Sequence, residues 1–272
     1  MSNKVFEIID AHYSYLAKYP ALNGINMEVS QGEKISVIGA NGCGKSTLLH
    51  IMDGLIFPDR GEARAFGREL TEKAFNDDLF SADFRKKVGL VFQNPDIQLF
   101  CPTVREDIVF GPVQLELDKV KFERRFEELI GLLSIEELLE RSPHQLSIGE
   151  KRKVALASTL IVDPEVIILD EPTAGLDPLT TRNIIDLLIK ENNSGKTIIT
   201  STHDLHIVEE ISDTVHVFNR DRRIVASGKP ADILGDRQLL QQNNLVHVHG
   251  HMHHEDIHVH AHSPLTHHPE DL

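Results

Sequence analysis

Residues 34–50 read KISVIGANGCGKSTLLH, in which an apolar run typical of a strand leads into a glycine-rich turn and then into a helix-forming run. The turn, residues 39–46, fits the pattern GxxxxGK[ST] and lies between a strand and a helix, where that pattern requires it. In such a loop, backbone N–H groups surround a polyphosphate at the positive end of the following helix. The stretch therefore predicts a nucleotide-binding site.

Each side chain of this loop has an expected task. Lys45 neutralises the outer phosphates, and the hydroxyl of Ser46 is a ligand for Mg²⁺. Asn41 shapes the turn, and its amide could reach a phosphate. The expected nucleotide-binding residues of this segment are Gly39, Asn41, Gly42, Gly44, Lys45, Ser46 and Thr47.

A second part of the predicted site is VIILDEP, residues 166–172, a strand-like run that ends in two acidic residues. Asp170 could hold Mg²⁺ through water, and Glu171 could polarise the water that attacks a phosphate. Two acids at a strand end are also a common surface feature. The loop at 39–46 is what makes the catalytic interpretation the favoured one.

Short apolar runs rich in β-branched residues alternate with segments of helical period, which predicts a mainly parallel sheet flanked by helices. Residues 25–33 and 61–67 have the alternating pattern of an antiparallel edge layer, and 118–160 is helical almost throughout. We expect strands at 34–39, 87–92, 166–170 and 197–201, and helices at 46–52, 103–110, 181–191 and 204–211.

The expected fold class is α/β, with a mainly parallel core sheet, an antiparallel β edge layer and an inserted helical subdomain. We expect one nucleotide-binding domain over residues 1–240, with the helical subdomain at about 95–162. Residues 241–272 are so rich in histidine and so poor in core-forming residues that a flexible tail is favoured, although the alternation in VHVHGHMH could also form a strand.

The composition of the chain limits which partners and which cellular compartment are expected. The formal net charge of -14 disfavours a nucleic-acid partner, because nonspecific binding needs a basic surface. The two cysteines, Cys43 and Cys101, and an N-terminus without a secretory pattern favour the cytoplasm. No apolar run approaches the roughly 20 residues that cross a bilayer, so membrane association is expected through a partner protein.

Further stretches occur in the order typical of ATP-binding cassette (ABC) ATPases, and the chain resembles that family over about residues 5–235. Taken alone, Gln93 could be a polar residue at a strand end and His203 a buried core histidine, but the order of the stretches that contain them favours the family. The residues carried over are Gln93 (VFQNP, the Q-loop), Ser147 and Gly149 (LSIGE, the signature), Asp177 (AGLDP, the D-loop) and His203 (TSTHD, the switch histidine).

The resemblance implies roles for these residues. Glu171 and His203 are the expected catalytic pair, and Ser46, Gln93 and Asp170 are the expected Mg²⁺ ligands. Tyr15 takes the place of the aromatic residue that stacks on adenine, with two close competitors in sequence, Tyr13 and Tyr19.

The signature LSIGE departs from the usual LSGGQ at Ile148 and Glu150. Its expected donors to a γ-phosphate, Ser147 and the N–H of Gly149, are both kept. Ile148 restricts the turn, and Glu150 adds negative charge near a site for an anion. We expect these two changes to alter the catalytic rate rather than the family.

In the family that this sequence resembles, the signature of one subunit covers ATP on a second subunit, so we expect a second ABC ATPase subunit, identical or paralogous. FQNPDIQLF, with Asp96, Gln98 and Phe100, is similar to the segment by which energy-coupling-factor (ECF) ATPases contact a transmembrane coupling protein. The resemblance therefore implies a peripheral protein at the cytoplasmic face of the membrane, together with a substrate-binding membrane subunit.

Ten of the sixteen histidines lie beyond Asn244, many of them two residues apart. Imidazoles spaced in this way can converge on Ni²⁺, Co²⁺ or Zn²⁺, although a solvated low-complexity tail is the plain alternative. The candidate ligands are His247, His249, His251, His253, His254, His258, His260 and His262.

Together, these features predict the ATP-binding subunit of an ECF-type ABC importer that hydrolyses Mg-ATP to drive uptake of nickel or cobalt. Two alternatives stay open. One is an ECF ATPase that serves vitamin uptake, with an incidental tail. The other is a metal-binding storage protein that uses nucleotide only as a conformational ligand.

Overall fold

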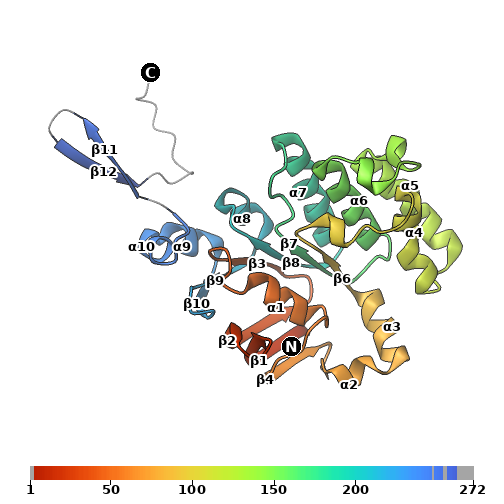
Figure 1. Cartoon of the computed structure of the whole chain (residues 1–272), viewed down its shortest axis with the longest axis horizontal. Coiled ribbons are helices and arrows are strands. Elements are labelled where there is room, and N and C mark those ends of the chain that lie inside the picture. Colours follow the sequence, from red (N-terminus) through yellow and green to blue (C-terminus); the bar gives the residue numbers. More distant parts are fainter. Residues whose placement is uncertain (1–2, 247, 254–255, 262–272) are drawn as a thin grey trace.

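A six-stranded sheet lies at the centre of this computed structural model, which describes residues 3–246, 248–253 and 256–261 (Figure 1). All neighbouring strands run parallel except for one antiparallel strand at an edge. The strand order is β10 (Ile224–Gly228), β9 (Thr214–Phe218), β3 (Lys34–Ile38), β8 (Thr197–Thr202), β7 (Val166–Asp170) and β6 (Val88–Val91).

The sequence explains why these segments form the sheet centre. Every residue of β7 and β8 is buried, as expected for parallel strands covered on both faces. The four strands expected at 34–39, 87–92, 166–170 and 197–201 are all present, which confirms the predicted mainly parallel sheet. Ligand sites in such sheets lie at the carboxyl ends of the strands, and the glycine-rich loop directly follows β3.

A second, antiparallel sheet forms the predicted edge layer, with the order β2 (Tyr19–Ser30), β1 (Lys4–Tyr15), β4 (Arg60–Ala65) and β5 (Arg68–Glu69). Helix α1 (Lys45–Met52) joins the two sheets in one core: Leu48 and Met52 share a buried apolar cluster with Phe6 of β1, Ile168 of β7 and Ile199 of β8. The N-terminus of α1, which carries the glycine-rich loop, is thereby fixed between both sheets.

Most other helices lie on one side of the central sheet (Figure 1). A second apolar cluster joins α4, α5, α6 and α7 to strands β7 and β8. The elements are α2 (Glu72–Phe75), α3 (Asp78–Lys87), η1 (Pro95–Ile97), α4 (Val104–Gln114), α5 (Lys119–Leu133), η2 (Glu136–Leu138), η3 (Pro143–Gln145), α6 (Ile148–Leu160), α7 (Pro178–Asn193), α8 (Leu205–Ile211), α9 (Pro230–Gly235) and α10 (Arg237–Gln242). Six of these elements, η1 to α6, lie within residues 95–162, and their assignment to a separate subdomain stays a prediction.

Beyond residue 246 the structure has two strands, which the sequence allowed as the alternative to a flexible tail. Strand β11 (Val248–His253) pairs antiparallel with β12 (Asp256–Ala261), and this hairpin projects from the body of the molecule beside α9 and α10 (Figure 1). The physical reason is the strict alternation of histidine with apolar or small residues, a period of two that suits a strand. The domain boundary expected at 240 also falls inside α10.

Candidate active site

The glycine-rich loop has a shape that only glycine permits at two positions. A Cβ atom on Gly39 would lie 2.6 Å from Cys43 Sγ, and one on Gly44 would lie 2.3 Å from the carbonyl oxygen of Ala21. Gly44 also has a φ of 111°, in the region that side chains disfavour. At the start of α1, the loop can therefore pass closely against Ala21. The binding of a polyphosphate by its N–H groups stays a prediction.

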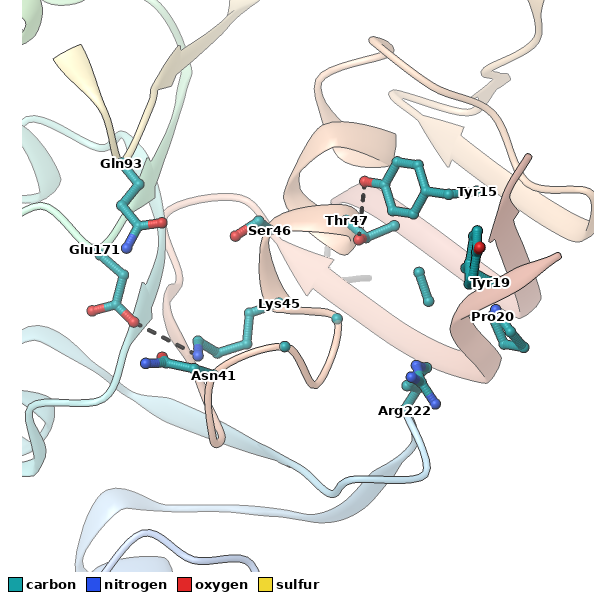
Figure 2. A pocket seen from close by; sticks show the side chains of 13 residues that line it. Tyr15, Tyr19, Pro20, Asn41, Lys45, Ser46, Thr47, Gln93, Glu171 and Arg222 are labelled. Atoms are coloured by element: carbon teal, nitrogen blue, oxygen red, sulfur yellow. Dashed lines mark hydrogen bonds and ion pairs between the residues drawn. The ribbon is translucent and has the colours of Figure 1, made fainter. Parts of the chain in front are cut away.

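A cavity of about 340 Å³ lies against this loop (Figure 2). Gln93 and Glu171 lie at one end of it, and Tyr15, Tyr19 and Arg222 lie at the other (Figure 2). All of the predicted nucleotide-binding residues except Gly39 line it: Tyr15, Asn41, Gly42, Gly44, Lys45, Ser46, Thr47 and Gln93. The fold thus gathers segments from both sheets around one elongated space.

Lys45 occupies the centre of the loop. Its ammonium group is almost fully buried and donates to the carbonyl oxygens of Gly39 at 2.8 Å and Ala40 at 3.5 Å. It also forms an ion pair with Glu171, with 3.6 Å between Nζ and Oε1. The positive charge is therefore held at the boundary between the loop and the carboxylate, where a terminal phosphate could accept from it.

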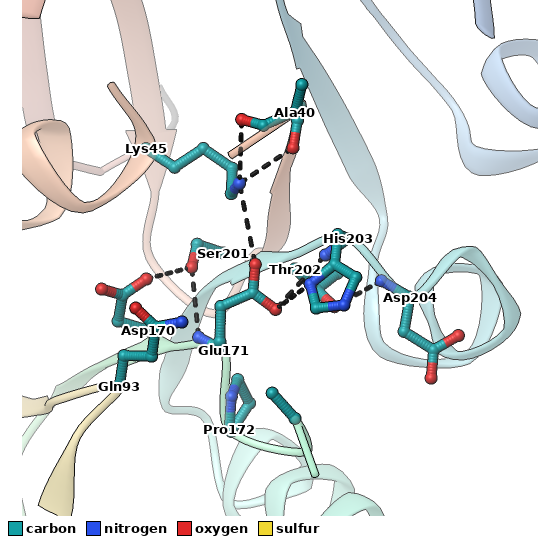
Figure 3. Close-up of polar contacts among 12 residues, drawn as sticks. Ala40, Lys45, Gln93, Asp170, Glu171, Pro172, Ser201, Thr202, His203 and Asp204 are labelled. Carbon is teal, nitrogen blue, oxygen red and sulfur yellow. Dashed lines mark hydrogen bonds and ion pairs between the residues drawn. The ribbon is translucent and has the colours of Figure 1, made fainter. Parts of the chain in front are cut away.

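Glu171 and His203 form the contact that most directly suggests hydrolysis (Figure 3). Oε2 of Glu171 lies 2.7 Å from Nδ1 of His203, and the Glu171 N–H donates to Ser201 Oγ at 3.1 Å. Glu171 is 4% exposed and has a strained φ of 50°. Within the described residues, its Oε1 is buried and accepts no hydrogen bond. One carboxylate oxygen thus remains able to accept from a water molecule.

The predicted Mg²⁺ ligands are hard oxygen donors, which is the chemistry that Mg²⁺ prefers. Ser46 and Gln93 line the cavity, whereas Asp170 is 4% exposed and accepts a hydrogen bond from the Ser201 hydroxyl. Asp170 lies next to Glu171 and Gln93 (Figure 3). In the described part of the chain, no three histidine, cysteine or acidic residues are grouped to hold a metal. The donor set therefore fits an ion that is bound mainly through phosphates and water.

The tyrosines separate into two groups. Tyr15 lines the cavity, and its hydroxyl lies 3.3 Å from Thr47 Oγ1. Tyr19 lines the cavity too and is 55% exposed. Tyr13 packs against the apolar core and contacts Tyr15 edge-on, with 5.0 Å between ring centroids. Of the two competitors in sequence, only Tyr19 shares the cavity with Tyr15.

The signature and D-loop residues cap helices elsewhere and do not line this cavity. Ser147 is the N-cap of α6, and its hydroxyl donates to Glu150 Oε2 at 2.7 Å. The Ser147 N–H donates to the same oxygen at 2.7 Å, and these bonds lower the pKa of Glu150. Asp177 caps α7 and accepts from the Thr180 N–H at 2.9 Å. A single chain therefore does not bring Ser147 or Asp177 to its own phosphate loop.

Arg152 is a site residue that the sequence motifs did not reveal. Its buried guanidinium donates to the carbonyl oxygens of Gln93 at 2.7 Å, Glu171 at 3.1 Å and Ala174 at 2.7 Å. Burial lowers its pKa, and the charge of Glu171 partly opposes this shift. The available signal was its position on α6, because Arg152 shares the buried helix face of Leu156.

Gln98, a residue of the expected docking segment, contacts α6, and docking by that segment stays a prediction. Its amide nitrogen donates to the carbonyl oxygen of Ala155 at 2.9 Å and to Thr159 Oγ1 at 3.0 Å, so it braces the Q-loop against α6. Asp96 pairs with Lys151 at 2.6 Å.

None of the helices in the described part of the chain has the length and apolar character to cross a bilayer.

Comparisons with known proteins agree with this fold. The family model for ABC transporters matches residues 22–174. The nickel import ATP-binding protein NikO of Rhodobacter capsulatus is 45% identical over 244 residues, which cover 89% of this chain and 95% of the relative. The energy-coupling factor transporter ATP-binding protein EcfA of Methanothermobacter thermautotrophicus is 42% identical over 241 residues, which cover 89% of this chain and 76% of that relative.

Among solved structures, CbiO1 of Clostridium perfringens, part of the ABC transporter complex CbiONQ, matches with a TM-score of 0.73 and 34% identity. The match covers 89% of this chain and 95% of CbiO1. The chain belongs to the ABC transporter ATPases, as an ATP-binding subunit of the ECF type. It is an ATPase coupled to transport that uses Mg-ATP, which confirms the family, the enzyme class and the fold class expected from sequence.

Proposed function

We propose that this chain is the ATP-hydrolysing subunit of an importer for a transition-metal ion, nickel or cobalt. The single observation that carries the hydrolytic part is the Glu171–His203 pair, which leaves one buried carboxylate oxygen without a hydrogen bond beside the phosphate loop. The metal part is supported by the similarity to NikO, which is named for nickel import, and by the histidine-rich C-terminal segment.

ATP binds with its phosphates on the N–H groups of residues 39–46 and its base at Tyr15. Lys45 moves its ammonium contact from the loop carbonyls to the outer phosphates. Ser46, Gln93 and Asp170 would hold Mg²⁺, which would neutralise phosphate charge. The side chains of Asn41 and Thr47 and the backbone of the loop glycines complete the nucleotide contacts.

Glu171 acts as the general base. Oε1, the oxygen that is ion-paired with Lys45 and accepts no hydrogen bond among the described residues, accepts a proton from the water that attacks the γ-phosphorus. The bond between the γ-phosphorus and its bridging oxygen breaks, and ADP leaves with that oxygen. His203 keeps the carboxylate turned toward the phosphate loop through the 2.7 Å contact with Oε2. Both side chains lie at carboxyl ends of neighbouring strands, β7 and β8, so their separation is set by the sheet.

A second ABC subunit, identical or paralogous, completes the site. Ser147, Gly149 and Asp177 do not line the cavity of their own chain, which supports contact with ATP on the opposite subunit. Ser147 is an N-cap and Gly149 lies in the first turn of α6, so N–H groups of that helix end can face an anion. ATP then joins the two subunits, and hydrolysis releases them.

The membrane partner is a transmembrane coupling protein at the cytoplasmic face, joined by a substrate-binding membrane subunit. An exposed apolar surface supports this docking: Ile97 is 63% exposed and Phe100 is 65% exposed. Phe100 stacks edge-on with Phe110, and Val113 of the same helix is exposed too. Exposed apolar groups of this kind mark a contact surface. The chain remains a peripheral subunit.

The C-terminal hairpin is the proposed binding segment for Ni²⁺, Co²⁺ or Zn²⁺. Its register places His249 opposite His260 and His251 opposite His258, and residues opposite each other in an antiparallel pair share one face. His253 lies opposite Asp256. Imidazole is a ligand type that suits a borderline divalent ion. The candidates His247, His254 and His262 lie outside the described residues.

The chain leading to this hairpin lies close to the nucleotide loop. Asn244 and Leu245 line a second cavity with Cys43, His203 and Arg220. Leu245 also packs against a buried cluster that contains residues of β3 and α8, the two elements next to the phosphate loop and the switch histidine. This placement supports a role of the hairpin in metal capture or in sensing the metal level.

Uptake of labelled nickel, labelled cobalt and a panel of vitamins, in cells that carry this gene with its genomic neighbours, tests the proposal. We expect Glu171→Gln to abolish uptake of one metal, whereas the exposed-carboxylate control Glu165→Gln keeps it. Loss of vitamin uptake with unchanged metal uptake would favour the vitamin alternative. Tight metal binding without any ATPase activity would favour the storage protein.

A further inference from the structure

The turn between β9 and β10 places Arg222 beside the nucleotide cavity (Figure 2). It lies at the end that also contains Tyr15, Tyr19 and Pro20, whereas Glu171 lies at the opposite end (Figure 2). Because the loop at 39–46 and Glu171 mark the phosphate half of the cavity, Arg222 borders the half that would receive the nucleoside.

The backbone of Arg222 is held in a conformation that suits glycine. Its φ is 63°, in the left-handed region where a side chain is strained. The turn is fixed on both sides: the Arg222 N–H donates to the carbonyl oxygen of Asn219 at 3.2 Å, and the Asn23 N–H donates to the carbonyl oxygen of Arg222 at 3.0 Å. A glycine would adopt this turn without strain. The arginine therefore costs stability where it stands.

Among the described residues, the Arg222 side chain has no polar partner that would offset this strain. The neighbouring Arg223 donates to the side chain of Asn23 at 3.3 Å and so anchors the turn. Arg222 is half-buried, yet within residues 3–246 and the hairpin strands its guanidinium makes no hydrogen bond or ion pair. Strained residues that persist at the edge of a site commonly serve a ligand.

We propose that Arg222 binds the nucleoside part of ATP, with Tyr19 as its neighbour on that wall. A planar guanidinium can lie on the face of a purine base and can donate to ribose hydroxyls or ring nitrogens. Tyr15 lies on β1, the strand that pairs with β2, which carries Tyr19, and the Tyr15 hydroxyl contacts Thr47. The base and ribose would therefore be contacted from β1, β2 and the β9–β10 turn. This inference rests on the proposed function in one respect, that ATP occupies this cavity.

The test compares nucleotide binding with stability in Arg222→Gly and Arg222→Ala. Calorimetric titration with ATP, ADP and inorganic tripolyphosphate separates the nucleoside half from the phosphate half. We expect both variants to bind ATP and ADP about threefold to tenfold more weakly, with tripolyphosphate unchanged. Arg222→Gly should at the same time raise the urea midpoint of unfolding, because it relieves the left-handed strain. Damage to the fold cannot produce this combination.

Lys18→Ala is the matched control, since Lys18 is a cation beside Tyr19, 5.3 Å from its ring centroid, that does not line the cavity. It should leave all three affinities unchanged. Wild-type ATP affinity in both Arg222 variants, or an equal loss for tripolyphosphate, would overturn the inference. A wild-type protein that binds tripolyphosphate and ATP shows the nucleotide site to be intact, so these outcomes concern Arg222 alone. If wild type binds neither, the proposed site fails and this inference with it.

Discussion

The Arg152 guanidinium donates to the carbonyl oxygen of Gln93 at 2.7 Å, which ties the helix that follows the signature to the Q-loop. The same side chain donates to carbonyl oxygens of Glu171 and Ala174, after strand β7. One buried cation thus joins three segments that the proposed mechanism uses. A movement of α6 caused by a second subunit or by a membrane partner would be transmitted to the catalytic carboxylate through these bonds.

Arg152→Lys should destabilise the protein and slow ATP turnover, because an ammonium group cannot bridge several carbonyls with the fixed fork of a guanidinium. Leaving buried carbonyls without donors should cost about 1–3 kcal/mol of unfolding free energy, measured by urea denaturation. The matched control is Arg124→Lys on the exposed side of α5, which should change neither quantity. Wild-type stability of Arg152→Lys would show that the segments are held by other contacts.

Glu150→Gln should strengthen ATP-dependent dimerisation. The Glu150 carboxylate accepts from both the N–H and the hydroxyl of Ser147, and it places a negative charge at the helix end proposed to face a γ-phosphate. Removing that charge should tighten the dimer about threefold to tenfold. The affinity of the dimer is measured by analytical sedimentation with Mg-ATP, in a protein that also carries Glu171→Gln. The exposed control Glu137→Gln should have no effect, and equal affinity in both variants would argue against a signature contact in trans.

Acid should destabilise the protein partly through His216. This histidine is 7% exposed, shares a 2.7 Å hydrogen bond with Ser227 Oγ, and has a buried Nε2 with no partner among the described residues. Burial lowers its pKa, which Glu33 partly opposes. Below a pH of about 6.5, the His216 imidazole is therefore protonated in the unfolded chain but stays neutral in the folded chain. The free energy of unfolding consequently falls as the pH falls.

Urea unfolding at about pH 7.5 and about pH 5.5, on either side of the ordinary histidine pKa, checks this pH dependence. His216→Gln should lose less stability on acidification than wild type, whereas the exposed control His206→Gln should behave as wild type does. An identical pH dependence in His216→Gln would mean that His216 takes up its proton without difficulty when folded.

The C-terminal hairpin should bind Ni²⁺ with an affinity that falls as pH drops through about 6.5, because imidazole must be neutral to act as a ligand. Replacing the opposed pair His249 and His260 by alanine should weaken binding more than replacing His267 and His268, which removes the same number of histidines outside the described residues. Affinity that does not vary with pH, or equal losses in the two double variants, would count against ligation by the hairpin face.

The sequence predicted those features whose cause is local. The phosphate loop, its flanking strand and helix, and the acidic end of 166–170 are encoded in contiguous residues, and the structure has the strands where the patterns indicated. Arg152 cannot be found from local sequence because the carbonyl oxygens that it donates to lie between 19 and 59 positions away in the chain. The two strands of the hairpin follow the period of two in residues 248–253 and 256–261, the alternative that the sequence left open.

ATP hydrolysis by the purified chain, compared with Glu171→Gln, tests the central claim most directly. The account predicts that the variant binds ATP with wild-type affinity and hydrolyses it at least about 100-fold more slowly, because its amide cannot accept the proton of the attacking water. Near-normal turnover by Glu171→Gln would contradict the assignment of Glu171 as the general base and the mechanism built on it.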